Sequence, residues 1–249
     1  MDLNDEDLLR YSRQILLPQI EINGQETLLN SKVLLFGAGG LGSPVAMYLA
    51  ASGLGEITIV DPDTVDLSNL QRQIIHQTQD IGSKKVLSAK QTLEQINPKS
   101  NVRTINEVLQ GDRLLKEIEQ ADVVVDATDN FESRFVINEA CVKRKKTLIT
   151  GAAIRFEGQV AVFDMQKDSA CYQCLFPDQA DALEESCSET GILGSVTGLI
   201  GSIQATEVIK VLLNIGQSIF NKLLLIDALN MEWHSVKINK DPKCAACSG

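Results

Sequence analysis

A glycine-rich stretch early in the chain has the spacing of a phosphate-binding turn. Gly37 to Gly42 reads GAGGLG, and Asp61 follows nineteen residues after Gly42. In a G-x-G-x-x-G turn between a strand and a helix, glycines allow close backbone approach, and N–H groups at the helix start hold phosphate. A carboxylate at the end of the next strand accepts ribose hydroxyls. The pattern predicts a nucleotide site containing Gly39, Gly40 and Asp61.

Charged residues further along the chain indicate which nucleotide this is. Arg72 and Lys85 are cations, and Asp129 closes a strand pattern. Because the carboxyl ends of parallel strands open on one crevice, we expect these side chains, with Asp63 and Asn130, to lie together. Arg72 and Lys85 suit the oxygens of a triphosphate, and Asp129 suits Mg²⁺. Each alone could be a solvated surface charge, but as a set they favour a triphosphate site.

Four of the six cysteines form two C-x-x-C pairs, Cys171 with Cys174 and Cys244 with Cys247. Four thiolates in two such pairs predict a tetrahedral, closed and therefore structural zinc site. The pairs are too far apart for a zinc ribbon, so the metal would tie the end of the chain to its body. Dithiol redox motifs are the alternative, although neither pair has the strand–helix position of a thioredoxin-like motif.

The elements that must position these residues alternate between strand and helix patterns. Such alternation predicts an α/β fold with a doubly wound, mostly parallel, Rossmann-like sheet. After Gly151 three further strand patterns surround a long helix, which predicts an added C-terminal sheet region. The expected strands are 32–37, 56–61, 101–109, 121–129, 147–154, 157–164, 222–228 and 232–238, and the expected helices are 43–53, 83–98, 111–120, 132–146 and 198–213.

The N-terminal segment predicts one further helix, over residues 5–17, because apolar residues recur there at helical intervals. We expect residues 1–249 to form a single domain. Its nucleotide-binding part would span about residues 31–150, and a second part, with the cysteines, about 151–249.

Composition excludes several classes of protein. The chain has 249 residues, of which 44% are hydrophobic, so it can bury one substantial core. Its net charge of -10 argues against nucleic-acid binding, which needs clustered cations. Polar residues interrupt the apolar stretch 196–213, which predicts a buried helix rather than a membrane span. With an acidic, polar start and no visible secretory signal, we expect a soluble, cytoplasmic protein.

Several longer motifs follow one another along the chain: RYSRQILL, GAGGLGSP, DPDTVDLSNLQRQ, KKV, DATDN, GAAIRFEGQ, CYQC and CAAC. Taken in this order, they resemble the motifs of the MoeB/ThiF family, the bacterial relatives of the ubiquitin-activating enzymes. The resemblance covers essentially the whole chain, and its SNLQRQ motif and paired C-x-x-C motifs are rare elsewhere.

The resemblance implies an enzyme that uses ATP and Mg²⁺ to adenylate the C-terminal glycine of a small ubiquitin-like sulfur carrier ending in Gly-Gly. It also implies the structural zinc. Family members are homodimers in which the arginine matching Arg13 reaches into the partner's ATP site. The matching positions imply these contacts: the nucleotide at Gly39 and Gly40, its ribose at Asp61, the phosphates at Asn69, Arg72 and Lys85, and Mg²⁺ at Asp129.

This chemistry needs no general base, because a C-terminal carboxylate is already ionised at neutral pH. The barrier lies in bringing an anion to a polyanion, which cations and Mg²⁺ relieve. The two histidines, His76 and His234, are therefore expected to be structural or surface residues. The stretch GAAIRFEGQ favours the molybdopterin carrier, while Trp233 and the segment around Cys187 favour the thiamine carrier. We expect the molybdopterin carrier, and a separate protein as sulfur donor.

Cys187 is a second candidate for catalysis. Its surroundings, PDQADALEESCSETG, predict a mobile loop across the site. Some family members have a cysteine here that joins the carrier's sulfur chemistry. However, neighbouring glutamates would raise the thiol pKa and disfavour the thiolate, so a spectator thiol is the alternative.

Two other classes of function compete with this interpretation. A nicotinamide-dependent dehydrogenase would explain the glycine turn and Asp61, but would leave Arg72, Lys85, Asp129 and the zinc without a role. A zinc-stabilised binding module would explain the cysteines but not the phosphate-binding residues. Measuring the release of pyrophosphate from ATP in the presence of a carrier distinguishes the three classes, because only the adenylating enzyme is expected to release it.

Overall fold

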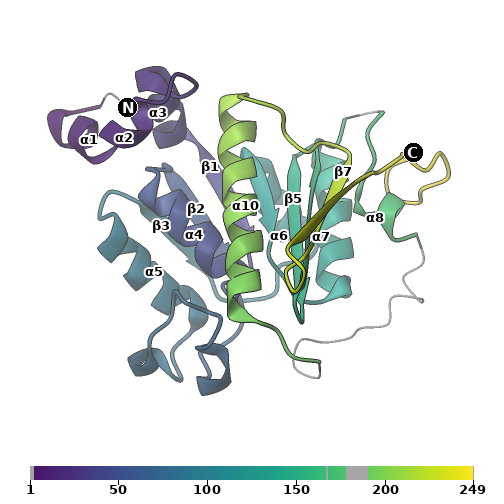
Figure 1. Cartoon of the computed structure of the whole chain (residues 1–249), viewed down its shortest axis with the longest axis horizontal. Helices are drawn as coiled ribbons and strands as arrows, with labels where there is room; N and C mark the ends of the chain where they lie inside the picture. Colours follow the sequence, from purple (N-terminus) through teal and green to yellow (C-terminus); the bar gives the residue numbers. More distant parts are fainter. Residues whose placement is uncertain (1–2, 167, 178–189, 249) are drawn as a thin grey trace.

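The protein is described by a computed structural model that covers residues 3–166, 168–177 and 190–248. A single eight-stranded sheet runs through it, in the order β3-β2-β1-β4-β5-β6-β7-β8 (Figure 1). The strands are β1 (Lys32–Phe36), β2 (Glu56–Val60), β3 (Asn101–Ile105), β4 (Val123–Asp126), β5 (Leu148–Ile154), β6 (Glu157–Phe163), β7 (Lys222–Asp227) and β8 (Glu232–Lys237).

The first five strands are parallel, and helices connect them. Strands β1 and β4 lie at the centre and are apolar on both faces, as expected for parallel strands covered on both sides. This half confirms the predicted doubly wound fold. Its helices are α4 (Gly42–Ala51), α5 (Lys85–Ile96), α6 (Gly111–Gln120) and α7 (Phe131–Arg144).

The added C-terminal region is an extension of the same sheet. Strands β6, β7 and β8 continue it in antiparallel pairing from β5, so no second sheet forms among the described residues. The long helix α10 (Gly194–Leu213) comes between β6 and β7 in the sequence, and it lies across one face of the sheet (Figure 1). Hydrogen bonding along β6 thereby joins the part with the cysteines to the nucleotide-binding part.

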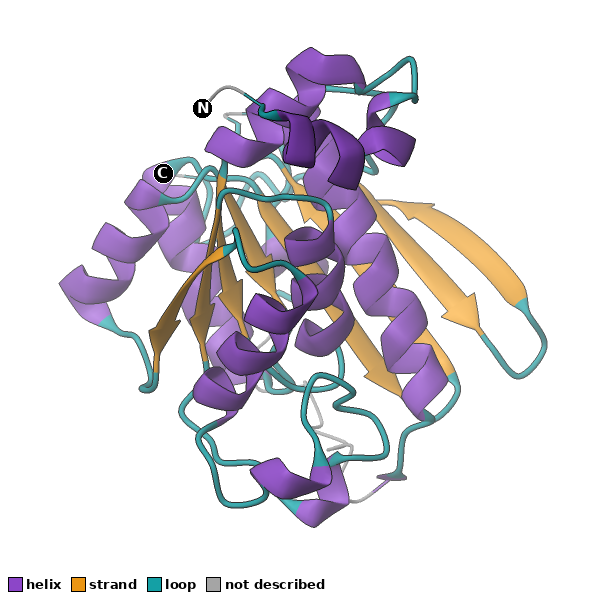
Figure 2. Cartoon of the chain, turned by 90° about the vertical axis from the view of Figure 1, so that its left-hand side faces the viewer, coloured by secondary structure: helices purple, strands orange, loops and turns teal. Residues whose placement is uncertain are grey.

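Helices cover both faces of the sheet (Figure 2). On one face, α4, α5 and α10 pack around residues such as Leu35, Leu49 and Ile200. On the other, α6 and α7 pack around residues such as Leu34 and Ile118. The neighbours Leu34 and Leu35 enter opposite cores because side chains alternate along a strand.

The N-terminal segment differs from the single helix predicted over residues 5–17. Two short helices form instead, α1 (Asp5–Arg10) and α2 (Ser12–Ile15). They are broken at Tyr11, whose side chain is 3% exposed and whose hydroxyl accepts a hydrogen bond from Nδ2 of Asn97 (2.9 Å). The helix α3 (Glu21–Asn30) follows and was not predicted.

Among the described residues, one helix, α10, is long and apolar enough to cross a membrane by length and composition alone. Here it contacts α4, β5 and β6, and its buried residues include Gln204 and Glu207. This agrees with the prediction of a buried helix.

Candidate nucleotide site and metal centre

A cavity of about 950 Å³ opens at the carboxyl ends of the parallel strands. Its walls come from the glycine-rich turn, the ends of β2 and β4, the start of α5, and strands β5 and β6. Of the residues predicted to bind the cofactor, eight line it: Gly39, Gly40, Asp61, Asp63, Arg72, Lys85, Asp129 and Asn130.

The glycine-rich turn requires glycine for steric reasons. A Cβ at Gly42 would lie 1.9 Å from the carbonyl oxygen of Gly37, and one at Gly37 would lie 2.6 Å from that of Ala127. Gly37 also has φ +95°, where other residues are strained. The turn is therefore packed directly against the end of β4, and Gly39 and Gly40 within it line the cavity.

Asp61 holds the glycine-rich turn in place by a hydrogen bond to its backbone. Its Oδ2 accepts a hydrogen bond from the N–H of Ala38 (2.7 Å), and its Oδ1 accepts one from the N–H of Asp63 (2.9 Å). Each oxygen keeps a second lone pair, and the residue lines the cavity. It can therefore position the turn and still accept ribose hydroxyls.

The two predicted cations, Arg72 and Lys85, both line the cavity. Lys85, at the start of α5, forms an ion pair with Asp63 (2.8 Å), and its side chain is 9% exposed against 62% for Asp63. Arg72 donates from Nη1 to the carbonyl oxygen of Ser68 (3.0 Å). Because the partner of Lys85 is solvated, an arriving phosphate can compete for the ammonium group at small cost.

Asp129 and Asn130 follow β4 and also line the cavity. Asp129 is exposed, whereas Asn130 caps α7 by accepting a hydrogen bond at Oδ1 from the N–H of Ser133 (2.8 Å). A solvated carboxylate beside a phosphate turn is the donor that Mg²⁺ takes when it also binds substrate phosphates and water. Asp129 thus fits the expected Mg²⁺ ligand, and Asn130 has a structural role.

Two of the predicted site residues that the structure describes, Asn69 and Arg13, do not line the cavity. Asn69 accepts a hydrogen bond at Oδ1 from the N–H of Asp66 (3.2 Å) and caps its own turn. Arg13 is exposed on α2, which packs at the far end of α4, where Gln14 donates to the carbonyl oxygen of Ser52 (3.1 Å). Cys187 lies outside the described residues.

The sequence did not single out three residues that line the cavity: Gln73, Arg134 and Thr197. Gln73 is 4% exposed and stands in the quoted SNLQRQ motif, which was the available signal. Thr197 comes from α10, so the C-terminal part contributes to the nucleotide site.

Arg134 connects the nucleotide site with the cysteines. It is 7% exposed, and it donates to the carbonyl oxygen of Thr128 (2.9 Å) and to the hydroxyl of Tyr172 (3.5 Å). Burial lowers the pKa of Arg134, but nearby Asp126, Tyr172 and Asp129 outweigh it and hold the pKa above its ordinary value. One turn further along α7, Asn138 accepts a hydrogen bond from the N–H of Tyr172 (2.9 Å). Helix α7 therefore spans from one site to the other.

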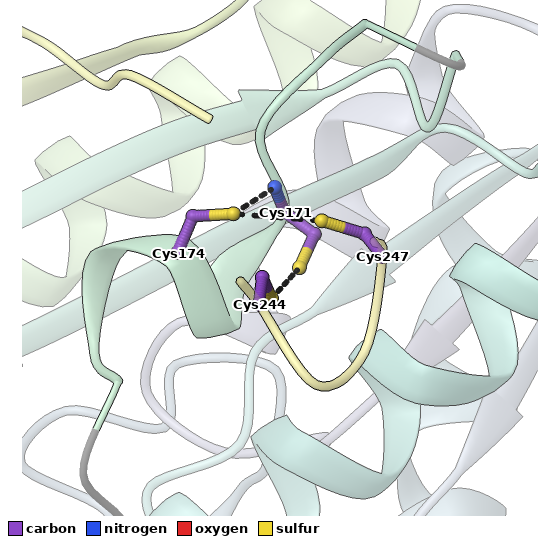
Figure 3. A group of neighbouring side chains, drawn as sticks. All are labelled: Cys171, Cys174, Cys244 and Cys247. Atoms are coloured by element: carbon purple, nitrogen blue, oxygen red, sulfur yellow. Dashed lines mark hydrogen bonds between the residues drawn. The ribbon is translucent and has the colours of Figure 1, made fainter. Parts of the chain in front are cut away.

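Four cysteines from two distant segments converge at the C-terminal end of the chain (Figure 3). Their sulfur atoms all lie within 4.8 Å of one another, with 3.7 Å between Cys171 and Cys244 and 3.5 Å between Cys174 and Cys247. A tetrahedral zinc ion with bonds of about 2.3 Å would place sulfur atoms about 3.8 Å apart. The four thiols fit zinc, and Cys141, fully buried in α7, lies outside the group.

We expect one zinc ion per chain, and Cys244→Ser should lose it. Three thiolates close the site poorly, so the free energy of unfolding should fall by several kcal/mol, about 10 °C in melting temperature. Cys141→Ala is the matched control, because burial raises the Cys141 pKa far above its ordinary value and makes this thiol inert. Metal analysis that finds no zinc in a reduced preparation made without chelator would contradict this.

The fold and these sites define a nucleotide-binding α/β protein with a group of four cysteines that could hold a metal ion. The sequence matches the ThiF family over residues 11–246. The chain therefore belongs to this family, as its motifs predicted.

Similar proteins carry names from more than one pathway. The chain is 42% identical, over 99% of its length, to the Escherichia coli (strain K12) sulfur carrier protein ThiS adenylyltransferase, of which it covers 98%. It is 41% identical, again over 99%, to the molybdopterin-synthase adenylyltransferase of the same organism, of which it also covers 98%. Culex quinquefasciatus adenylyltransferase and sulfurtransferase MOCS3 is 42% identical over 99% of the chain, which spans only 56% of that longer protein.

Solved structures share the fold. The crystal structure of E. coli MccB with ATP has a TM-score of 0.83 and 25% identity, with 96% of this chain and 75% of that chain covered. The relatives' names do not distinguish one carrier from another.

Proposed function

We propose that this protein adenylates the C-terminal glycine carboxylate of a small ubiquitin-like sulfur carrier, using ATP and releasing pyrophosphate. The proposal rests on one observation: a single cavity is lined by the glycine turn and by three charged residues, Arg72, Lys85 and the exposed Asp129. The names of the 41–42% identical relatives support it. A dehydrogenase, the distant alternative, would need none of these three charges.

In the proposed reaction, a carboxylate oxygen of the carrier attacks the α-phosphorus of ATP. A new P–O bond forms as the bond to the pyrophosphate oxygen breaks, and no proton must be removed. The residues act by position and charge: the turn's N–H groups hold phosphate, and Arg72 and Lys85 offset the charge of the two anions. Mg²⁺ held by Asp129 would supply further charge neutralisation.

Ala153 of β5 and Gly158 of β6 also line the cavity, so residues 151–249 form part of its wall. A tail ending in Gly-Gly is narrow enough to lie along such a wall. Exposed apolar side chains of the β7–β8 hairpin, including Leu229, Met231 and Trp233, support contact between the carrier's body and residues 151–249.

We propose a homodimer with Arg13 acting in the partner's site. Within its own chain, Arg13 is separated from the cavity by α4, whose ten residues span about 15 Å, more than an arginine side chain reaches. Leu9 and Leu16 beside it are 77% and 71% exposed, and burial in an interface would remove these apolar surfaces from water. The family resemblance supports the same arrangement.

The proposed carrier is the molybdopterin-synthase subunit, supported by the stretch GAAIRFEGQ, most of which forms β5 and the start of β6. The thiamine-pathway carrier is the alternative. A separate protein would donate sulfur, and the expected cytoplasmic location, single domain and role of Cys187 remain predictions.

The test is to incubate the protein with each purified carrier, ATP and Mg²⁺, and to weigh the carriers by mass spectrometry. We expect the mass of one adenylyl group on the molybdopterin carrier, while a carrier lacking its last glycine stays unmodified. Modification of the thiamine carrier alone would overturn the carrier assignment. Modification of neither carrier, with no pyrophosphate released, would overturn the proposed function.

A further inference from the structure

Behind the glycine-rich turn lies His76, which is 5% exposed and which the proposed reaction does not use. Its Nε2 lies 2.9 Å from the carbonyl oxygen of Ala38, inside the turn. Its Nδ1 lies 2.8 Å from Oγ of Ser88 on α5, and that hydroxyl lies 2.8 Å from Oδ2 of Asp80. The three side chains thus form a buried hydrogen-bonded chain that ends at the phosphate-binding turn.

The number of available hydrogens limits the protonation states that His76, Ser88 and Asp80 can adopt together. A carbonyl oxygen can only accept, so Nε2 of His76 must carry a hydrogen. Ser88 has one hydroxyl hydrogen for two contacts. If it donates to Asp80, Nδ1 must carry a hydrogen and His76 is an imidazolium. If it donates to His76, Asp80 must be protonated to complete the second contact.

The remaining combination is a neutral imidazole with an ionised Asp80. It leaves one of the two 2.8 Å contacts without a hydrogen, so two buried lone pairs would face each other. A buried polar group without a partner costs free energy that a hydrogen bond would avoid. Both permitted arrangements contain one more proton than this combination.

We propose that His76, Ser88 and Asp80 share this one proton, and that a polyphosphate bound at the turn draws it to His76. In the transfer, Asp80 gives its proton to Oγ of Ser88 while Ser88 gives its own to Nδ1 of His76. No proton enters or leaves, and the products are an imidazolium and a carboxylate. The ligand-dependent half rests on the proposed function, whereas the shared proton does not.

The charges around His76 explain why the ligand decides where the proton lies. The pKa of His76 lies below its ordinary value, because burial and the nearby Lys85 outweigh the Ala38 carbonyl, Asp61 and Asp80. A polyphosphate would add negative charge on the side of the turn and engage Lys85. Both changes favour a positive charge on His76.

The consequence is a turn that is held more firmly when it is occupied. Ala38 is fixed at its N–H by Asp61 (2.7 Å) and at its carbonyl by His76 (2.9 Å). A hydrogen bond from an imidazolium is stronger than one from a neutral imidazole. His76 is therefore a positioning residue that adds positive charge behind the phosphates.

The experiment is nitrogen NMR of the histidine side chains in the full-length, wild-type protein at neutral pH. The chain has only two histidines, and His234→Gln, on the exposed β8, assigns the signals. Carboxyl carbon shifts, assigned with Asp80→Asn, report whether Asp80 is protonated. Without nucleotide we expect a neutral imidazole with protonated Asp80; an imidazolium with ionised Asp80 would keep the shared proton but overturn its transfer on binding. Imidazole with ionised Asp80 would overturn the shared proton.

Addition of ATP, or of inorganic triphosphate as the simpler probe, should leave both His76 nitrogens protonated and Asp80 ionised. A bare Nδ1 in the complex would overturn the second half. Ser88→Ala should abolish the response and raise KM for ATP about fivefold with little change in kcat, while Ser88→Thr, which keeps the hydroxyl, should preserve both. If Ser88→Ala does not fold, the wild-type spectra still decide. Failure of ATP to bind would count against the proposed function and leave the nucleotide-free spectra as the test.

Discussion

Asp129→Ala should abolish adenylation while leaving the fold intact. Asp129 is exposed at the cavity wall, so its removal creates no void in either core. Loss of the proposed Mg²⁺ ligand removes charge stabilisation where two anions meet, and we expect the rate to fall by at least about a thousandfold. Exchange of labelled pyrophosphate into ATP measures the rate, and circular dichroism with a melting curve checks the fold.

Glu119→Ala is the matched control for this prediction. It also removes an exposed carboxylate, but from the end of α6 away from the cavity, where Glu119 pairs with Arg144 at 3.8 Å. Its exchange rate should equal that of the wild type. If Asp129→Ala exchanges pyrophosphate at a rate near wild type, the assignment of Asp129 to Mg²⁺ is wrong.

A mixed dimer of Arg13→Ala and Arg72→Ala chains should be active although each parent dimer is inactive. If Arg13 acts in the partner's site, one site of the mixed dimer combines an intact Arg72 with an intact Arg13, and the other site carries both changes. We therefore expect about half the activity of the wild-type dimer, provided that each arginine stabilises the transition state strongly. The two chains should be co-expressed with different tags, so that the mixed dimer can be purified.

The controls separate action between chains from action within one chain. If Arg13 acts in its own chain, the mixed dimer has two sites that each lack one arginine, and its activity should be no higher than that of the parents. A mixed dimer of one wild-type chain and one doubly substituted chain contains the same residues in another arrangement. In that dimer each site has one change, so it should be inactive if Arg13 acts between chains.

Local patterns were enough to predict the parallel half of the sheet and eight of the residues that line the cavity. In the turn formed by Gly37 to Gly42, a Cβ at Gly42 would lie 1.9 Å from backbone. The close packing of this turn is therefore the reason for the glycine that the motif contains. Asp61, Lys85 and Asp129 were found because each closes a strand pattern or begins a helix pattern. Parallel topology then brings these positions to one edge without any long-range information.

Contacts between distant segments could not be predicted in the same way. The break at Tyr11 depends on Asn97, 86 residues away, and on Gly53, whose missing Cβ makes room for the tyrosine ring. Helix α3 contains Asn23 and Gly24, which weaken its pattern, and it is stabilised by packing against α10 and by buried Gln25. Arg134 resembles a surface cation in a helix, and only the fold reveals that it is buried between the nucleotide site and Tyr172.

The most direct test of the central claim is carrier-dependent exchange of labelled pyrophosphate into ATP. The adenylate forms reversibly from a free carboxylate, so exchange should require a carrier that ends in an ionised glycine. We predict rapid exchange with the native carrier and none with the same carrier amidated at its C-terminus. Equal exchange with both carriers, or none with any carrier ending in free Gly-Gly, would contradict activation of the terminal carboxylate at this site.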